Sequence, residues 1–442
     1  MAASFDSDAV TSLAQRAGDP DWLIEGRLDA LERFGSLPWP EMSLEQWKHT
    51  DIRSLDLESF DAAPPAHEPV AGLDDVPADI RALAIGQKGD RLGLAIQIDA
   101  DVVHTRLAAP LAQQGVIFAP LGEGVSALGE RARELLGRAG VSDHEAKLAA
   151  LNHAFASGGA LLYVPRGVVV EKPIQSVRWL SGAGIASFPR VVVIVEDGAS
   201  VTYIDHYASA ELAGDALNMA AVEIYAGQAA HVDYLMVQDL GQQVWHFSQV
   251  RALIERDATV RCFDAALGGR LARSVVESVL DGQGARAEML GLYFGDHAQH
   301  MDVRTLQLHR GPHTSSEVYY KGALKGTSHA VYSGLVDIEK DAKQADAQQL
   351  DRNLLLSDGA GADPSPFLEI KTSEVTRATH GVSVGRPDAE VLFYLRSRGL
   401  SDADAERLYV TGFFQEIIDR VHVPEVRETL TAAVEDELAL ED

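Results

Sequence analysis

One histidine lies where its side chain could do chemistry. His380 falls in the stretch Ala378-Thr-His-Gly381, beside a glycine that lets another group approach closely. A neutral imidazole is a good ligand for iron, so this position could supply one ligand of an iron centre. The alternative is a structural histidine that caps the end of the β scaffold preceding it. The residue types alone leave both interpretations open.

The thiol content limits the iron chemistry. Cys262 is the single cysteine of the chain, and it lies in an alternating segment where burial as a small apolar side chain is the simpler interpretation. One cysteine excludes an internal disulfide. A cluster held by one chain usually needs about four thiolates. We therefore expect the chain alone to hold no cofactor stably.

Other motifs argue against further chemistry. His297 with His300, and His309 with His313, superficially suggest a metal site. His297 and His300 are three apart and would face opposite sides of a strand, and no carboxylate or thiolate spacing completes a known site at either pair. We expect no metal there. The segment Gly322–Thr327 lacks the spacing of a phosphate-binding loop, which predicts that the chain does not hydrolyse ATP and is not an enzyme of that kind.

Composition narrows the class of protein. The chain has 442 residues, of which 46% are apolar and 24% charged, enough for more than one folded unit. A net charge of −28 disfavours nucleic acid and anionic membranes as partners. No apolar run approaches the roughly 20 residues that span a bilayer. The N-terminus lacks the basic and apolar regions of a secretory signal. We expect a cytoplasmic protein.

Three parts of the chain must position His380. Residues 1–158 are predicted to be a mainly helical domain, with a Pro/Ala-rich linker near 58–79. Within it, helices are expected over residues 125–138 and from Ser142 onward. Residues 159–385 are mostly short β-like runs. Residues 386–442 have helical periodicity, and Ser401 with Asp404 forms a capping box that predicts the start of a helix there. His380 therefore lies close to a strand-to-helix junction.

An internal repeat predicts the architecture of the β part. Four segments share a Gly or Asp turn, an alanine and an alternating run, and their alanines are Ala199, Ala229, Ala258 and Ala285, spaced by 30, 29 and 27 residues. Such a period predicts a solenoid, here a parallel β-helix from about 160 to 370, in which the alanines of successive turns stack. A β-sandwich is the competing interpretation, because frequent turn signals also fit that fold.

Several segments match one known family in order along the chain. They are Glu45–Asp51, Tyr163–Ile174, Gln344–Leu356, Leu368–Ile370, Thr379–Gly381, Val384–Gly385 and Phe393–Gly399. In these segments the chain resembles the SufB/SufD family, the scaffold subunits of the Suf iron–sulfur cluster assembly system. The resemblance implies a mainly β fold, a right-handed parallel β-helix flanked by N-terminal and C-terminal helical domains.

The resemblance also implies that a transient iron–sulfur cluster forms in the complex, and that His380 has a role in its formation at the interface with a SufB-like partner. It implies that a SufC-like ABC ATPase binds the C-terminal helices. The docking candidates are Phe393, Tyr394, Arg396, Arg398, Leu408 and Phe413. Ala378 stands where the family often has cysteine, so a thiolate would come from the partner. The single cysteine and the Trp47 segment favour the SufD type of the family, and a homodimer of the isolated chain is compatible with it.

Two other classes of protein are compatible with a β-helix. A purely structural adaptor would hold partners without cluster chemistry and would tolerate loss of His380. A carbohydrate-active β-helix enzyme would need a carboxylate pair on an exposed face. The sequence shows no such pair at matched positions of the repeat and no secretory signal. The scaffold interpretation is therefore preferred.

Overall fold

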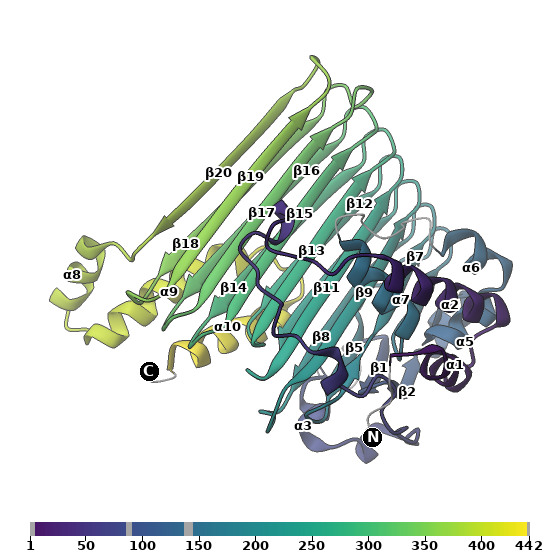
Figure 1. Cartoon of the computed structure of the whole chain (residues 1–442). Helices are drawn as coiled ribbons and strands as arrows, with labels where there is room; N and C mark the ends of the chain where they lie inside the picture. The colour runs from purple at the N-terminus through teal and green to yellow at the C-terminus, as the bar shows by residue number, and fades with distance from the viewer. Residues whose placement is uncertain (1–4, 85–90, 137–144, 440–442) are drawn as a thin grey trace.

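The computed structural model describes residues 5–84, 91–136 and 145–439 (Figure 1). Its dominant feature is a parallel β-helix of about eight turns, in which each turn gives one strand to each of two long sheets. Helices lie at both ends of the chain (Figure 1). The mainly β fold with a parallel β-helix and helical flanks is confirmed, and the β-sandwich is excluded.

The two sheets run the length of the solenoid. In spatial order, sheet 1 contains β2 (Asp101–Leu107), β1 (Gly93–Ile98), β5 (Ile174–Leu180), β8 (Ser200–Ser209), β10 (His231–Asp239), β12 (Thr259–Ala266), β14 (Arg286–Gly295), β16 (Ser315–Leu324), β18 (Asp346–Leu355) and β20 (Arg377–Gly385). Sheet 2 contains β19 (Gly361–Ile370), β17 (His329–Ile338), β15 (His300–His309), β13 (Leu271–Leu280), β11 (Val244–Ile254), β9 (Ala216–Ala226), β7 (Arg190–Val195), β4 (Ala160–Val164) and β3 (Ile117–Pro120), with β6 (Ala186–Ser187) beside β9. The pairs β1–β2 and β3–β4 are antiparallel, and the other pairs are parallel.

An alanine ladder runs through the turns, with one correction to the predicted set. The register aligns Ala199, Ala230, Ala258 and Ala285, all of them buried. The prediction that Ala229 belongs to this ladder was wrong. Ala229 is exposed and adopts a φ of 55° in the preceding turn, so its neighbour Ala230 enters the strand stack instead. The spacing between alanines in the sequence does not show that one turn is a residue longer.

The N-terminal region mixes helices with strands. Its helices are α1 (Ser7–Arg16), α2 (Asp21–Ser36), α3 (Ala78–Ala82), α4 (Ala109–Gln113), α5 (Leu121–Leu128), α6 (Glu130–Leu135) and α7 (Ala146–Phe155), with 3-10 turns at Glu45–Trp47, Leu57–Ser59 and Leu73–Asp75. Strands β1 to β3 fall within the residues assigned to the mainly helical domain, and they extend both sheets. The helix expected over residues 125–138 is broken at Gly129, whose φ is 62°. The expected helix start at Ser142 lies outside the described residues.

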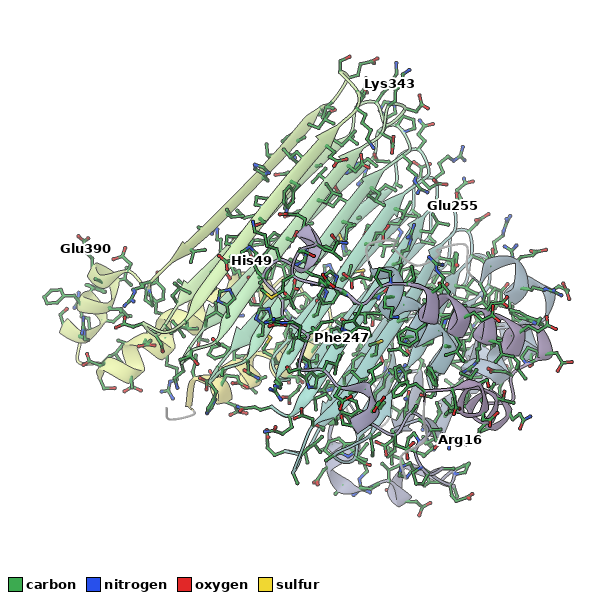
Figure 2. The ribbon with its side chains drawn as sticks, in the orientation of Figure 1. Arg16, His49, Phe247, Glu255, Lys343 and Glu390 are labelled. Atoms are coloured by element: carbon green, nitrogen blue, oxygen red, sulfur yellow. The ribbon has the colours of Figure 1, made fainter. Side chains whose placement is uncertain are left out.

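A segment from the N-terminal region crosses the outer face of sheet 2 and is fixed there by a buried ionic cluster. Trp47 is buried, and its ring centroid lies 3.8 Å from the Arg273 guanidinium. Arg273 pairs with Glu145 and Asp302, and the Thr50 hydroxyl donates to an Asp302 carboxylate oxygen at 2.5 Å. Figure 2 shows His49 on this crossing segment, over the sheet face. The N-terminal region is thereby tied to later turns of the solenoid.

The C-terminal helices are α8 (Ala389–Ser397), α9 (Asp402–Ile418) and α10 (Pro424–Ala439). The predicted cap at Ser401 is confirmed, because its hydroxyl accepts from the Asp404 amide at 3.1 Å. Helices α9 and α10 pack on the outer face of sheet 1. There the buried Lys321 ammonium donates to Glu416 at 2.6 Å. None of the helices in the described ranges is long and apolar enough to cross a membrane.

Candidate functional site

His380 lies at the end of a ladder that runs inside the solenoid. The strand register aligns one inward-facing residue per turn, and we call this set the inner ladder. Its members are Tyr203, Tyr234, Cys262, Met289, Val318, Gln349 and His380. The first six are buried, whereas His380 is exposed, because β20 is the last strand of sheet 1 in the described residues.

The surroundings of His380 are regular and accessible. Residues 377–385 form a continuous strand, and neither Gly381 nor Gly385 adopts a positive φ. Among the described residues, no hydrogen bond or ion pair is found for the His380 side chain. The next two inward positions, Val382 and Val384, are each 40% exposed. The imidazole therefore lies on a partly apolar surface at the open end of the β-helix.

Cys262 lies in the same inner ladder but cannot reach His380. Three side chains, those of Met289, Val318 and Gln349, lie between the two residues. The thiol is buried, and burial raises its pKa to about 12, with the nearby Asp264 and Asp233 adding to the shift. It is a protonated core side chain at neutral pH, in agreement with the interpretation made from its alternating segment.

The edge of the last turn is open along both sheets. β20 pairs with β18, and β19 pairs with β17, so each strand has one side without a neighbouring strand in the described residues. On β19, Phe367 is 41% and Ile370 is 45% exposed. An open edge of this length, with apolar side chains on it, is a surface suited to strand addition by a partner.

The six docking candidates separate into two environments. Phe393 and Tyr394 on α8 are 70% and 54% exposed, and Leu408 on α9 is 53% exposed. The Arg396 guanidinium pairs with Asp402 at 3.1 Å, and Arg398 lies 5.1 Å from the Tyr394 ring centroid. Figure 2 shows Glu390, on the same helix α8, well away from the turns of the solenoid.

Phe413 differs from the other five candidates. It is half-buried, and its ring packs against Phe414 and lies 4.6 Å from the Lys321 ammonium. Phe414 itself is buried in the apolar cluster between α9 and sheet 1. Removing residues 399–442 would uncover that cluster, so single substitutions at exposed positions are the cleaner way to examine docking.

The histidine pairs do not come together. His300 and His309 lie at opposite ends of β15, and His297 and His313 lie in turns with φ of 50° and 59°. Burial lowers the pKa of His309 to about 4, and its ring nitrogens bond to hydroxyls. Across the part of the chain that the structure describes, no group of three His, Cys, Asp or Glu side chains is arranged to hold a metal ion.

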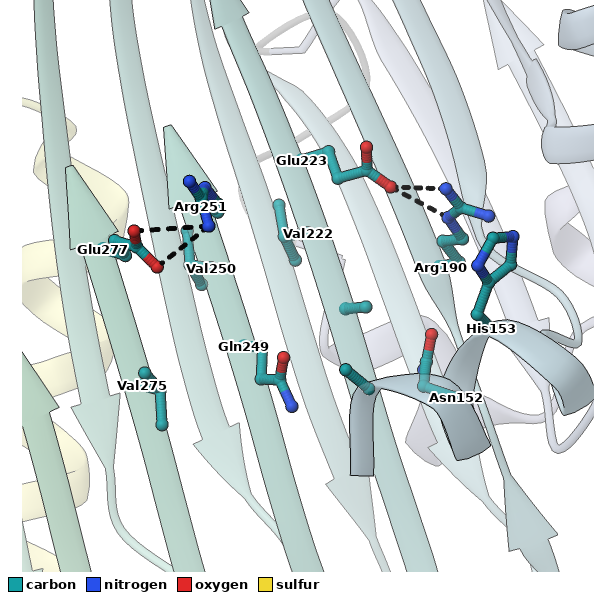
Figure 3. Close-up of a pocket in the computed structure, with 12 residues that line it drawn as sticks. Asn152, His153, Arg190, Val222, Glu223, Gln249, Val250, Arg251, Val275 and Glu277 are labelled. Atoms are coloured by element: carbon teal, nitrogen blue, oxygen red, sulfur yellow. Dashed lines mark hydrogen bonds and ion pairs between the residues drawn. The ribbon is translucent and has the colours of Figure 1, made fainter. Parts of the chain in front are cut away.

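A charged pocket lies where α7 meets the outer face of sheet 2 (Figure 3). It encloses about 40 Å³, and two ion pairs line it, Arg190 with Glu223 at 2.6 Å and Arg251 with Glu277 at 3.3 Å. Ligand pockets usually measure about 300–1,000 Å³. The charge of Arg190, followed by burial, lowers the pKa of His153 to about 3. Both ion pairs join neighbouring strands of sheet 2, and the space between them is too small for an ordinary ligand.

Sequence reasoning missed a polar seam inside the solenoid. Asp264 and Asp351 lie two residues beyond members of the inner ladder and share its inward face. Burial raises the pKa of Asp264 to about 6 and that of Asp351 to about 7. The Tyr293 hydroxyl donates to Asp351 at 3.1 Å. The sequence shows each aspartate two residues after a position of the inner ladder. Only the strand register shows that both aspartates face the interior.

The fold and the site together define a parallel β-helix protein that carries its candidate histidine on an open terminal turn. Comparison with known proteins gives the family. A family model described as "SUF system FeS cluster assembly, SufBD core domain" matches residues 178–413, and one described as "SufBD protein N-terminal region" matches residues 93–176. The chain belongs to the SufB/SufD family of the Suf iron–sulfur cluster assembly system, whose members are scaffold components.

Relatives of both types of the family are similar to the chain. It is 30% identical to the iron-sulfur cluster assembly protein SufD of Bacillus subtilis, over 98% of each chain. It is 28% identical to the SufB protein of the same organism, over 92% of this chain and 88% of the relative. An iron-sulfur cluster assembly SufBD family protein of Mycobacterium tuberculosis is 39% identical over 69% of this chain and 77% of the relative.

Proposed function

We propose that this chain is a SufD-type, non-catalytic scaffold subunit of a cytoplasmic SufB–SufC–SufD complex that assembles iron–sulfur clusters. In that complex His380 contributes to the nascent cluster at the interface with a SufB-like partner. The observation that carries the proposal is the position of His380 at the open end of the solenoid, where its side chain is exposed and makes no hydrogen bond among the described residues. The full-length similarity to a SufD protein supports the type.

The open turn supports an interface at this end. Along the free side of β20 the main chain presents N–H and C=O groups that a partner strand would satisfy. Val382 and Val384 add apolar surface next to the histidine. A partner that pairs with β20 would place its own side chains beside the His380 ring. Burial of this edge would also remove an aggregation hazard from the isolated chain.

The chemistry assigned to His380 is ligation. One ring nitrogen offers its lone pair to iron, while the other carries the proton. The thiolates of the cluster come from the partner, because the thiol of Cys262 is buried and burial raises its pKa to about 12. A SufC-like ATPase supplies nucleotide hydrolysis and docks on the exposed positions of α8 and α9. This chain then provides a rigid frame and one ligand.

The test is to replace His380 in the reconstituted complex. The His380→Ala complex should assemble normally and lose cluster formation. Its free energy of unfolding should change by less than about 0.5 kcal/mol, because the side chain is exposed. Cluster content is measured by iron and sulfide analysis and by visible absorption. His231→Ala is the matched control, because His231 is an exposed histidine on another strand of the same sheet.

Two outcomes would contradict the ligand role. A full yield of clusters from the His380→Ala complex would mean that the chain acts as a purely structural adaptor. A marked fall in melting temperature with a proportional loss of assembly would mean that His380 serves the packing of the last turn. Neither outcome would alter membership of the family, which rests on the sequence matches.

A further inference from the structure

Gln349 is the residue directly below His380 in the inner ladder. The two residues are partners in the register between β18 and β20, and adjacent strands of a sheet lie about 4.8 Å apart. Side chains at paired positions of parallel strands point the same way. Gln349 is 3% exposed, so its amide lies inside the solenoid under the imidazole.

The side-chain amide of Gln349 is hydrogen-bonded through its nitrogen. Its Nε2 donates to the Tyr332 hydroxyl at 3.0 Å, and that hydroxyl shares a hydrogen bond with Thr305 at 2.9 Å. Gly334 makes room for the amide, since a Cβ at that position would lie 1.6 Å from Nε2. The side chain is therefore fixed across the interior of the turn formed by β17 and β18, next to the last turn.

The oxygen of the same amide lacks a hydrogen-bond donor among the described residues. Gln349 Oε1 is buried and makes no hydrogen bond within the described residues. A buried acceptor without a donor costs about 1–3 kcal/mol, so an atom of this kind calls for an explanation. The His380 imidazole also makes no hydrogen bond among the described residues. One unused acceptor and one unused imidazole N–H thus occupy neighbouring rungs of the same ladder.

We propose that Gln349 is a positioning residue for His380: its Oε1 accepts the N–H of the imidazole and directs the other ring nitrogen toward the open end of the solenoid. A metal-binding histidine commonly donates its second N–H to an oxygen acceptor, which fixes the tautomer and the ring orientation. This inference rests on the proposed ligand role of His380. It adds that the ligand is oriented from within this chain, through the hydrogen-bonded series Thr305, Tyr332 and Gln349.

The test uses the reconstituted complex and three variants of this chain. Gln349→Met keeps the approximate shape and removes the amide acceptor, and Gln349→Glu retains an acceptor. Gln348→Met is the matched control, because Gln348 is the neighbouring glutamine on the opposite face of β18. We expect Gln349→Met to lower cluster yield about 10- to 100-fold, as losses of such outer hydrogen bonds do. Gln349→Glu should restore most of the yield, and Gln348→Met should leave it unchanged.

A spectroscopic measurement separates positioning from packing. With ¹⁵N-labelled histidine, pulsed EPR of the reduced cluster should show nitrogen coupling in the unaltered complex and a weaker or absent coupling with Gln349→Met. If Gln349→Met does not fold, Tyr332→Phe serves instead, because it removes the hydroxyl that holds the amide and keeps the ring. Full yield with unchanged nitrogen coupling in the folded variant would overturn the positioning role.

The outcome is distinguishable from failure of the proposed function. If the His380→Ala complex builds clusters normally, the ligand role itself fails and no residue is needed to orient that ring. If His380→Ala abolishes clusters while Gln349→Met and Tyr332→Phe preserve both yield and nitrogen coupling, His380 is a ligand and only the positioning role is rejected.

Discussion

Buried carboxyl groups inside the solenoid make the stability of the fold depend on pH. Asp264 is buried next to Cys262 and Tyr320, and it faces the Ser274 hydroxyl from the opposite sheet. Burial raises its pKa to about 6, well above the roughly 3.9 of an unfolded chain. The neutral acid is the form that the fold prefers. Stability from this group is complete below about pH 4 and is lost as the pH rises through about 6.

Asp264→Asn should remove this loss. The variant keeps the shape and stays neutral at every pH, so it should be more stable than the unaltered chain at pH 8, by on the order of 3 kcal/mol. Near pH 4 the two should differ little. Denaturant unfolding at both pH values measures the difference. Asp29→Asn, at an exposed position on α2, should show no such gain. Equal stability of the Asp264 variant and the unaltered chain at pH 8 would contradict the pKa assignment.

At the scale of elements, regular patterns were predictable from the sequence and irregular ones were not. Period-two alternation and the repeat of about 30 residues indicated the β-helix, and Ser401 indicated the start of α9. The extra turn residue at Ala229 and the break at Gly129 depend on single positive φ values, which no period shows. The half-buried state of Phe413 depends on Lys321, which lies 92 residues away in the sequence. This contact fixes Phe413 of α9 against sheet 1, whereas α8 has no buried residue.

Substitutions on α8 should weaken ATPase binding without unfolding the chain. Phe393 is 70% exposed and α8 has no buried residue, so Phe393→Ser removes apolar contact area at little cost in stability. An aromatic anchor at the centre of an interface is often worth about 2 kcal/mol or more, so we expect at least a 10-fold weaker affinity for a SufC-like ATPase. Calorimetry with the purified ATPase measures this. Val169→Ser, at a position 59% exposed on another part of the surface, is the control. Unchanged affinity of the Phe393 variant would place the docking site elsewhere.

At the scale of the whole molecule, the surface charge and the thiol content both favour a role that depends on protein partners. A net charge of −28 on 442 residues favours solubility and protein partners over nucleic acid. The one thiol lies in the core. The long sheets give a stiff body, on which the crossing segment and the C-terminal helices are fixed by Arg273 and Lys321. Under the proposed function, this body would hold its partners in fixed geometry and would rely on them for thiolates and nucleotide hydrolysis.

The isolated chain should therefore hold no stoichiometric cluster and hydrolyse no ATP. The reason is the single buried thiol, together with a sequence that lacks a phosphate-binding loop. Anaerobic incubation with iron and sulfide, followed by gel filtration and metal analysis, measures the first property, and phosphate release measures the second. The complete complex, treated in the same way, is the positive control. A cluster that stays with the chain alone through gel filtration would contradict this expectation.

The two ends of the solenoid differ in a way that limits how many chains can join. At one end the sheets finish in the short antiparallel strands β2 and β3, of 7 and 4 residues, and at the other in the parallel strands β20 and β19, of 9 and 10 residues. A fibre grows by repeated head-to-tail contact and needs a receptive surface at both ends of every subunit. Here the long flat edge exists at one end. When two such edges meet, each satisfies the other, and growth by this contact stops at a pair. The asymmetry in strand length would thus limit assembly through this edge to closed pairs and would prevent growth into a fibre.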